Sequence, residues 1–300
     1  MRNWIWLSVL ILVLAACGAP APQTTLPAAT VPVQESTAPT VDLTAEVNAL
    51  KSGDTATASA GLEKILANNP SSAEAHLLLG QAYYRADQKD QAQDQFMAAF
   101  KLNPAAVPPL ESQDADEWLK FGNAHASLNQ LDEALAAYQT VLKIKPDKAA
   151  AYTNIGVVYY QAGQFDKAIE QMKKALEIEP NDAETYYMLG ATYVQQQNLD
   201  EAEQAFNKAI EFKSDLAAAY TGLGNVQMAR KNFAEAVKTL QQATALQPDQ
   251  AEAWLALGQA LAQQGNKTEA TTALNKCLDL SQAGPLRDRC EQLVQQLGTP

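Results

Sequence analysis

Side chains that bind metals or act as acid–base catalysts are scarce in this chain. Its 300 residues include two histidines, His76 and His125, and three cysteines. No CxxC, HExxH or P-loop sequence occurs, and the Gly-Leu-Gly run at residues 222–224 follows no predicted strand, so it lacks the context of a dinucleotide-binding loop. The two histidines are predicted to lie in the core. Only short turns are predicted between the helices, so an active site built from several converging loops cannot form. We therefore expect that the protein is not an enzyme and has no cofactor and no metal site.

Aromatic residues and positive charge are also limited. Aromatics make up 7% of the chain and hydrophobic residues 47%, which favours packed amphipathic helices over sheets, and hence an all-α class. Asp and Glu outnumber Lys and Arg by 34 to 22, for a formal net charge of −12. Nucleic acid and anionic lipid surfaces are disfavoured as partners, because both need a basic face. The acidity indicates a solvated surface that resists self-association.

The first apolar run is shorter than a membrane-spanning helix. Arg2 precedes thirteen uncharged residues, 4–16, whereas a spanning helix needs about 20, so residues 1–16 are predicted to be a signal peptide. The run LAAC at residues 14–17 resembles a bacterial lipobox. The resemblance implies lipidation of Cys17, export, and anchoring to the bacterial cell membrane or outer membrane. A plain secretory signal with a chance cysteine is the alternative.

Residues 17–40 are predicted to form a tether. After Cys17 they are rich in Pro, Ala and Thr, and Glu35 is the only charged residue. Such a segment cannot bury an apolar face and stays extended. In a polyproline II conformation it reaches up to roughly 70 Å from a lipid surface.

Glycine and alanine recur with a period of 34 residues. Two ladders in phase are typical of a helical repeat array. Each period predicts two antiparallel helices, whose axes approach closely where the glycine at position eight and the alanine at position twenty lie, while large residues at positions four and twenty-four fill the remaining space. The ladders comprise Gly80, Gly122, Gly156, Gly190, Gly224 and Gly258, and Ala92, Ala134, Ala168, Ala202, Ala236 and Ala270.

Polar residues and prolines indicate the ends of the second helix of each copy. Residues at position eighteen are predicted to cap the start of that helix, because a side-chain oxygen accepts from free amides there. Prolines at position thirty-two are predicted to stop it. The expected caps are Asp90, Asp132, Asp166, Asp200 and Thr268, and the expected stops are Pro104, Pro146, Pro180 and Pro248.

The pattern resembles the tetratricopeptide repeat family over residues 73–284. The resemblance implies a right-handed superhelical solenoid of antiparallel helix pairs. Residues 41–72 are predicted to be a degenerate capping repeat, 107–114 an insertion that acts as a hinge or merely bulges, and 285–300 a capping helix and tail. The six copies are expected at residues 73–106, 115–148, 149–182, 183–216, 217–250 and 251–284.

The same resemblance implies that a protein or peptide partner binds along the first helices. Groove positions of the family here carry mostly uncharged side chains, and the basic set that clamps a carboxylate terminus in chaperone-binding members is absent. An internal segment is therefore expected as ligand, held by amide hydrogen bonds and aromatic contacts. Packing of the tyrosines between helices is the alternative. The candidate groove residues are Tyr84, Arg85, Asn123, Thr153, Val157, Tyr160, Tyr187, Thr221, Asn225 and Met228.

Cys277 and Cys290 flank a predicted turn near Ala283. An exported protein meets an oxidising compartment, so a disulfide is one hypothesis. Neighbouring helices usually lie about 8–10 Å apart, and a disulfide needs Cα atoms about 4.4–6.8 Å apart, so two buried thiols are the alternative.

The function expected from these features is a membrane-anchored, extracytoplasmic scaffold or adaptor. It would bind peptide segments in the concave groove and serve the assembly of an envelope complex. A pilotin-like assembly factor for a type IV pilus or secretin is one alternative. A glycan- or peptidoglycan-binding protein is another.

Overall fold

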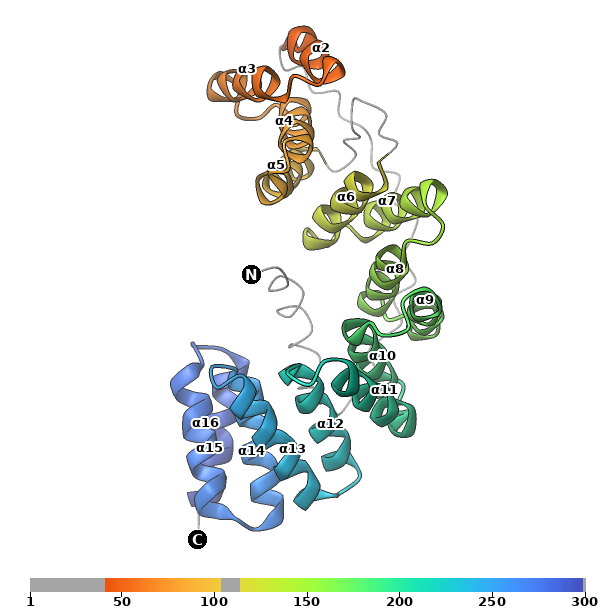
Figure 1. Ribbon diagram of the computed structural model, residues 1–300. Coiled ribbons are helices and arrows are strands. Elements are labelled where there is room, and N and C mark those ends of the chain that lie inside the picture. The colour runs from red at the N-terminus through yellow and green to blue at the C-terminus, as the bar shows by residue number, and fades with distance from the viewer. Residues whose placement is uncertain (1–40, 104–113, 299–300) are drawn as a thin grey trace. The chain divides into compact units, whose positions relative to one another are not determined.

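The computed structural model describes residues 41–103 and 114–298, and all elements in these ranges are helices. They fall into two compact units (Figure 1). The first comprises residues 41–103 together with 127–130, and the second comprises residues 114–126 and 131–298. The expected signal peptide, Cys17, the tether, Pro104 and most of the insertion lie outside the described residues. The all-α class and the solenoid of helix pairs expected from the sequence are confirmed.

The first unit is built from two helix pairs. Its core includes Leu50, Leu62 and Leu78, which are fully or almost fully buried. The guanidinium of Arg85 donates to the carbonyl oxygen of Leu50 at 2.9 Å and so joins the first and third helices. The unit contains α2 (Thr44–Ser52), α3 (Thr55–Asn68), α4 (Ala73–Arg85) and α5 (Lys89–Leu102).

The second unit stacks helix pairs in sequence order and ends in a single helix (Figure 1). Within it, each first helix begins at the first residue of a 34-residue copy. It contains α6 (Ala115–Ser127), α7 (Leu131–Ile144), α8 (Ala149–Gln161), α9 (Phe165–Ile178), α10 (Ala183–Gln195), α11 (Leu199–Phe212), α12 (Ala217–Ala229), α13 (Phe233–Leu246), α14 (Ala251–Gln264), α15 (Lys267–Leu280) and α16 (Pro285–Gly298).

The glycine at position eight lies against the large residue at position twenty-four of its own copy. A Cβ added to Gly122 would stand 2.3 Å from Cε1 of Tyr138, and one added to Gly80 would stand 2.3 Å from Cε1 of Phe96. The alanine at position twenty is also buried in every copy, but its backbone is not the nearest obstacle. At Gly156 the carbonyl oxygen of Ala168 would be 3.1 Å from the added Cβ, whereas Cγ of Met172 would be 2.9 Å away. The glycine therefore makes room mainly for the side chain at position twenty-four.

The turn inside every copy passes through a left-handed residue at position fifteen. The next backbone N–H then donates to the carbonyl at position eleven, as from Asn198 to Tyr193 at 3.0 Å, which is the Schellman closure of a helix. Glycine occupies this position in only two copies. The residues with positive φ are Asp87 (60°), Asn129 (58°), Gly163 (72°), Gln197 (62°), Lys231 (63°) and Gly265 (92°).

The capping role predicted for position eighteen is wrong. The second helices begin one residue earlier, so the acidic residues lie inside the first turn, where they complement the helix dipole. Two of them instead join consecutive copies: Asp166 accepts from the side-chain amide of Gln196 at 2.6 Å, and Asp200 pairs with Arg230. The second helices α7, α9 and α13 end two residues before Pro146, Pro180 and Pro248, as the prolines predicted.

Side chains at position four also join neighbouring copies. The Tyr220 hydroxyl donates to the carbonyl of Ser214 at 3.2 Å, and the Trp254 indole donates to the carbonyl of Pro248 at 2.9 Å. His76 occupies the same position in the first unit and is half-buried, with ring nitrogens 2.7 Å from Oε1 of Gln95 and 3.1 Å from the carbonyl of Pro70. The core placement expected for both histidines thus holds for His125, which is 5% exposed, and is wrong for His76.

The C-terminal helix is fastened to the last copy by a disulfide. Cys277 of α15 and Cys290 of α16 are bonded, with their Cα atoms 6.4 Å apart, and both are fully buried. Arg287 of α16 also donates to the carbonyls of Leu278 at 2.8 Å and Ser281 at 3.2 Å. The sequence left open whether Cys277 and Cys290 form a disulfide or remain two buried thiols, and the structure contains the disulfide.

Candidate functional site

The first helices of consecutive copies form a continuous surface in the second unit. Contacts run from α8 to α10, from α10 to α12 and from α12 to α14. In Figure 1, α6, α8 and α10 lie on the inner side of this unit's curve, and α7, α9 and α11 lie on the outer side. Residues on the solvent-facing side of the first helices therefore share one concave surface.

Half of the candidate groove residues are half-buried side chains on this surface. They are Asn123, Thr153, Tyr187, Asn225 and Met228. Tyr84 and Arg85 belong to the first unit, where Arg85 is engaged with the carbonyl of Leu50.

The remaining three candidates pack between helices. Val157 and Tyr160 are 7% exposed and Thr221 is 6% exposed, and the Thr221 hydroxyl donates to the carbonyl of Ala217 at 3.1 Å. Burial raises the pKa of Tyr160 to about 12, because its phenolate would lose hydration. Burial leaves these three residues little surface for a ligand, and the alternative of packing, which the sequence offered for the tyrosines, holds for Tyr160.

Two short hydrogen-bond chains run across the first helices. The Asn123 side-chain oxygen of α6 accepts from Asn154 of α8 at 2.9 Å and from the Tyr138 hydroxyl of α7 at 2.9 Å. The hydroxyls of Thr153 and Thr185 lie 2.8 Å apart and connect α8 to α10. These chains give the surface fixed, uncharged donors and acceptors.

Tyr187 lies next to these chains on α10. Its ring packs against Phe206 with centroids 6.0 Å apart, and burial raises the pKa of its hydroxyl. The side chain remains half-buried, so part of it faces the concave surface. A rigid aromatic beside amides and hydroxyls suits contact with a peptide.

A hollow at the C-terminal end of this surface was not predicted from the sequence. It lies between α12, α14 and α16. Eight of its nine lining residues are absent from the candidates, and among them are Lys231, Gln259, Gln263, Arg289 and Leu293. Of the candidates, only Met228 lines it. Arg289 and Leu293 belong to α16, which follows the last copy of the repeat, so the family's groove positions do not extend to them.

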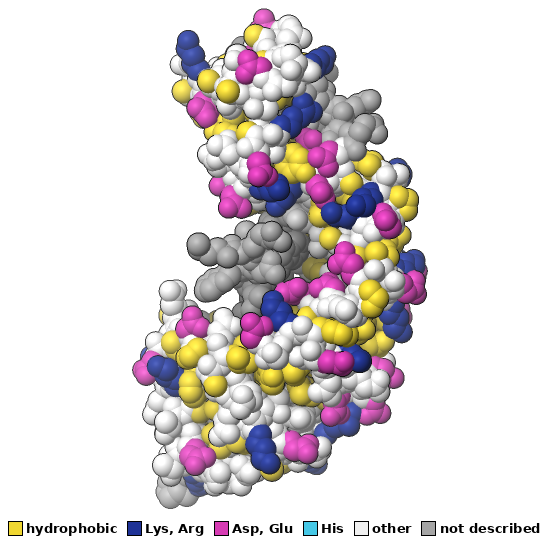
Figure 2. All heavy atoms as spheres, in the orientation of Figure 1, with side chains coloured by type: hydrophobic (Ala, Val, Ile, Leu, Met, Phe, Trp, Pro, Cys, Tyr) yellow, Lys and Arg dark blue, Asp and Glu magenta, His cyan; other side chains and the backbone are white. Residues whose placement is uncertain are grey.

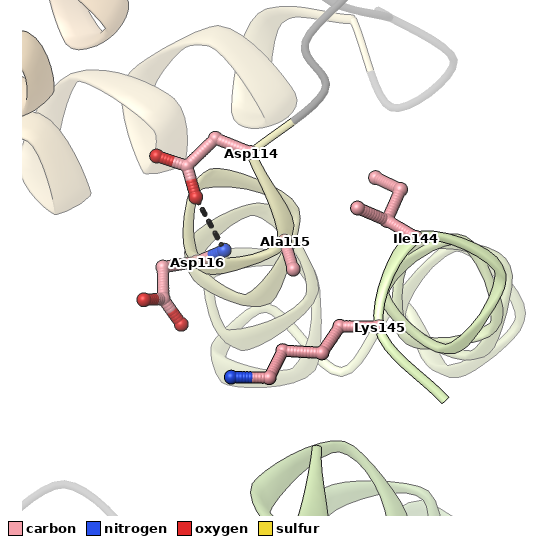
Figure 3. A pocket seen from close by; sticks show the side chains of 5 residues that line it. All are labelled: Asp114, Ala115, Asp116, Ile144 and Lys145. Carbon is pink, nitrogen blue, oxygen red and sulfur yellow. Dashed lines mark hydrogen bonds between the residues drawn. The ribbon is translucent and has the colours of Figure 1, made fainter. Parts of the chain in front are cut away.

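A second, more open hollow lies where the start of α6 faces the end of α7 (Figure 3). The Asp114 carboxylate accepts from the backbone N–H of Asp116 at 2.8 Å and so caps α6. The Asp116 carboxylate pairs with Lys148 at 2.6 Å. Both acids are thus used to hold the helix, and we assign no ligand here.

Charged side chains of both signs are interspersed over the face shown in Figure 2. Nowhere in residues 41–103 and 114–298 do three or more His, Cys, Asp or Glu side chains gather in a group suited to a metal ion. In the same ranges, no helix has both the length and the apolar composition needed to cross a bilayer.

Four family models match the chain. Three are described as tetratricopeptide repeat, at residues 49–108, 147–215 and 221–285, and one as TPR repeat, at residues 122–163. Together they match most of the sequence.

Two curated relatives are peroxisomal targeting signal receptors. The receptor of Candida glabrata is 35% identical over 81 residues, and that of Saccharomyces cerevisiae is 34% identical over 94 residues. These alignments cover 27% and 31% of this chain but only 12% and 14% of the two receptors.

Solved structures share the fold at low identity. The Cut9-Hcn1 hetero-tetramer of the APC/C is 18% identical, with 85% of this chain and 48% of that chain covered and a TM-score of 0.60. Yeast Tom70 is 17% identical, with coverage of 81% and 58% and a TM-score of 0.55. The thermophilic protein TTC0263 of Thermus thermophilus is 22% identical, with coverage of 61% and 100% and a TM-score of 0.52. By its helix pairs, its 34-residue period and these matches, the chain belongs to the tetratricopeptide repeat family, whose arrays are protein-interaction scaffolds.

Proposed function

We propose that this protein is a lipid-anchored, extracytoplasmic scaffold that binds a segment of another protein along the concave surface of its second unit. The observation that carries the binding role is the uncharged strip formed by Asn123, Asn154, Thr153 and Tyr187. Hydrogen bonds between helices hold the two amides and the threonine hydroxyl in place, and the Tyr187 ring packs against Phe206. Fixed amides and hydroxyls match the backbone of an extended or helical segment without selecting for charge.

The relatives support a peptide ligand. The two curated relatives are receptors for a targeting signal, and they share about a third of their residues with this chain over the aligned segments. Since the chain spans only a small part of those receptors, their signal and their partners are not transferred to it.

Two independent features support export. The run at residues 14–17 resembles a lipobox, with Cys17 as the lipidated residue. The disulfide between Cys277 and Cys290 is a bond that persists in oxidising compartments and is rare in the cytosol. We propose that residues 17–40 tether the array to the bacterial cell membrane or outer membrane and that the array helps to assemble an envelope complex there.

The test is crosslinking in the native cells, followed by identification of co-purified proteins. Intact protein is compared with a Cys17→Ala variant and with a Tyr187→Ala/Asn225→Ala variant, each checked for abundance and for an unchanged unfolding midpoint. An Asn207→Ala/Gln242→Ala variant, with both exposed changes on second helices, is the matched control.

We expect a defined protein partner that is lost with the groove variant, retained with the control, and recovered from the membrane fraction only when Cys17 is present. A partner whose recovery is the same with the groove variant would refute the proposed surface. Cell-wall glycan recovered in place of protein would favour glycan binding.

A further inference from the structure

The last copies of the array and the C-terminal helix form a half-open hollow of about 390 Å³. Its walls come from α12, α14 and α16, with the start of α13, all in the second unit (Figure 1). Met228, Phe233, Ala262 and Leu293 supply an apolar lining, and each of them is half-buried. A space of this size accommodates one or two large side chains of a partner.

Positive charge surrounds this lining. Lys231 and Arg289 are exposed lining residues, and no acidic residue lines the hollow. Within the described residues Lys231 makes no ion pair, and Arg289 donates to the neutral side-chain oxygen of Gln292 at 2.9 Å. The chain has a net charge of −12, yet this hollow is lined by two cations and no acid.

Neighbouring arginines show the contrast. Arg230 pairs with Asp200 and, at 3.0 Å, with Glu203, and Arg287 pairs with Glu291 at 3.0 Å. Their charges are balanced inside the fold. Lys231 and Arg289 are the cations left to face the hollow, so the matching ligand carries negative charge next to an apolar group.

We propose that this hollow binds an acidic segment of a partner protein, with a large apolar side chain of the segment in the cavity and flanking carboxylates on Lys231 and Arg289. The proposal rests on the proposed function, since it places one anchor of the same concave surface and defines the chemistry of what binds there. It assigns a binding role to α16, which lies outside the six copies.

The wall formed by α16 is held rigidly enough for such a role. Cys290 follows Arg289 directly and is bonded to Cys277 of α15, and the guanidinium of Arg287 donates to the carbonyls of Leu278 in the last turn of α15 and of Ser281 just after it. The positions of Arg289 and Leu293 relative to α14 are therefore fixed before a ligand arrives, which reduces the entropy lost on binding.

The test is selection of a random peptide library, displayed on phage, against the complete chain without its signal peptide and with Ser in place of Cys17. Selected peptides are synthesised with amidated C-termini and measured by fluorescence anisotropy. The variant is Lys231→Glu/Arg289→Glu, and the matched control of equal net charge is Lys238→Glu/Lys276→Glu, at exposed lysines of α13 and α15.

We expect selected sequences that combine acidic residues with Leu, Met, Phe or Trp. Their affinity should fall at least roughly tenfold in the variant, stay within about twofold of the wild type in the control, and weaken several-fold between about 50 and 300 mM salt. Selection of sequences without acidic residues, or equal affinity for variant and control, would overturn the proposal.

Two outcomes separate this site from the proposed function. Peptides that lose affinity with Tyr187→Ala/Asn225→Ala but not with Lys231→Glu/Arg289→Glu would leave the scaffold role intact and refute only the acidic site. Binding of dextran sulfate that depends on the two cations, without selection of acidic peptides, would identify a polyanion site and refute a protein ligand there.

Discussion

Position fifteen of each copy is a left-handed turn residue, and four of the six residues there are not glycine. The left-handed conformation destabilises a residue that has a Cβ by roughly 1 kcal/mol or more. Glycine avoids this strain, but it also raises the conformational entropy of the unfolded chain, which offsets part of the gain. Gln197→Gly is therefore expected to stabilise the second unit by about 0.5–1 kcal/mol. The measurement is the urea midpoint at constant m-value. Gly163→Ala, at the same position with φ of 72°, should shift the midpoint the other way, and a stabilising alanine there would contradict this account.

The glycine at position eight is limited by space rather than by its backbone angles. A methyl group at residue 80 would stand 2.3 Å from the ring of Phe96, so Gly80→Ala should cost about 1–3 kcal/mol through overpacking. The Gly80→Ala/Phe96→Leu double variant should lose less stability than the sum of the losses in the two single variants, because the leucine leaves room for the methyl group. Strictly additive losses in chemical denaturation would show that the two positions do not compete for space.

Buried tyrosine predicts a loss of stability at high pH. The pKa of Tyr160 is raised by burial to about 12, above its value near 10 in the unfolded chain. The unfolded state therefore releases its proton first, and the stabilisation present below pH 10 is lost as the pH rises from 10 towards 12, by at most about 1.4 kcal/mol per pH unit for one group. Tyr160→Phe should reduce this slope in urea unfolding measured between pH 9 and 11. The same change at half-buried Tyr152 provides a comparison, and equal slopes in Tyr160→Phe and the wild type would refute the effect.

At the scale of the helix, the disulfide determines how readily α16 separates from the array. Cys277 and Cys290 are 13 residues apart, and closing a loop of this length contributes about 3 kcal/mol in the chain-entropy model. In a Cys277→Ala/Cys290→Ala variant, amide exchange should accelerate strongly in α16 and little in α12, because solenoid helices contact mainly their neighbours. Uniform acceleration along the second unit would mean that the bond stabilises the array as a whole.

The sequence predicts the helices better than it predicts their contacts. The 34-residue period places the starts of all first helices, because glycine, alanine and the large residues recur wherever two helices must pack. It does not reveal that Gln197 and Lys231 turn left-handed, since the Schellman bonds of the surrounding copy override the local preference. Nor does it reveal that Asp166 and Asp200 bind the next copy, because a cap and an inter-copy acceptor call for the same residue at nearly the same position.

The candidate surface shows the same limit. Tyr160 and Tyr187 both occupy groove positions of the family, but Tyr160 is covered by neighbouring helices, and only the packing in three dimensions separates them. The hollow at α16 could not be found from the repeat, because two of its walls continue the array and the third lies beyond it. Lys231 and Arg289 lie 58 positions apart in the sequence, and the sequence does not show that both cations face one hollow.

For the whole molecule, the division into two units predicts that the second folds without the first. Apart from residues 127–130, the helices α6–α16 form a compact unit with its own core and a capping helix at its C-terminal end. A fragment of residues 114–298 should therefore unfold cooperatively, keep the disulfide between Cys277 and Cys290, and bind acidic peptides selected on the complete chain with affinity within about twofold. Circular dichroism on heating and fluorescence anisotropy measure these properties. A matched fragment that begins at Ala183 lacks two copies of that unit and should unfold at a lower temperature, because each copy removed takes away an interface with its neighbour. If the fragment from 114 unfolds without a cooperative transition while the complete chain unfolds with one, the second unit depends on α2–α5 for its folding.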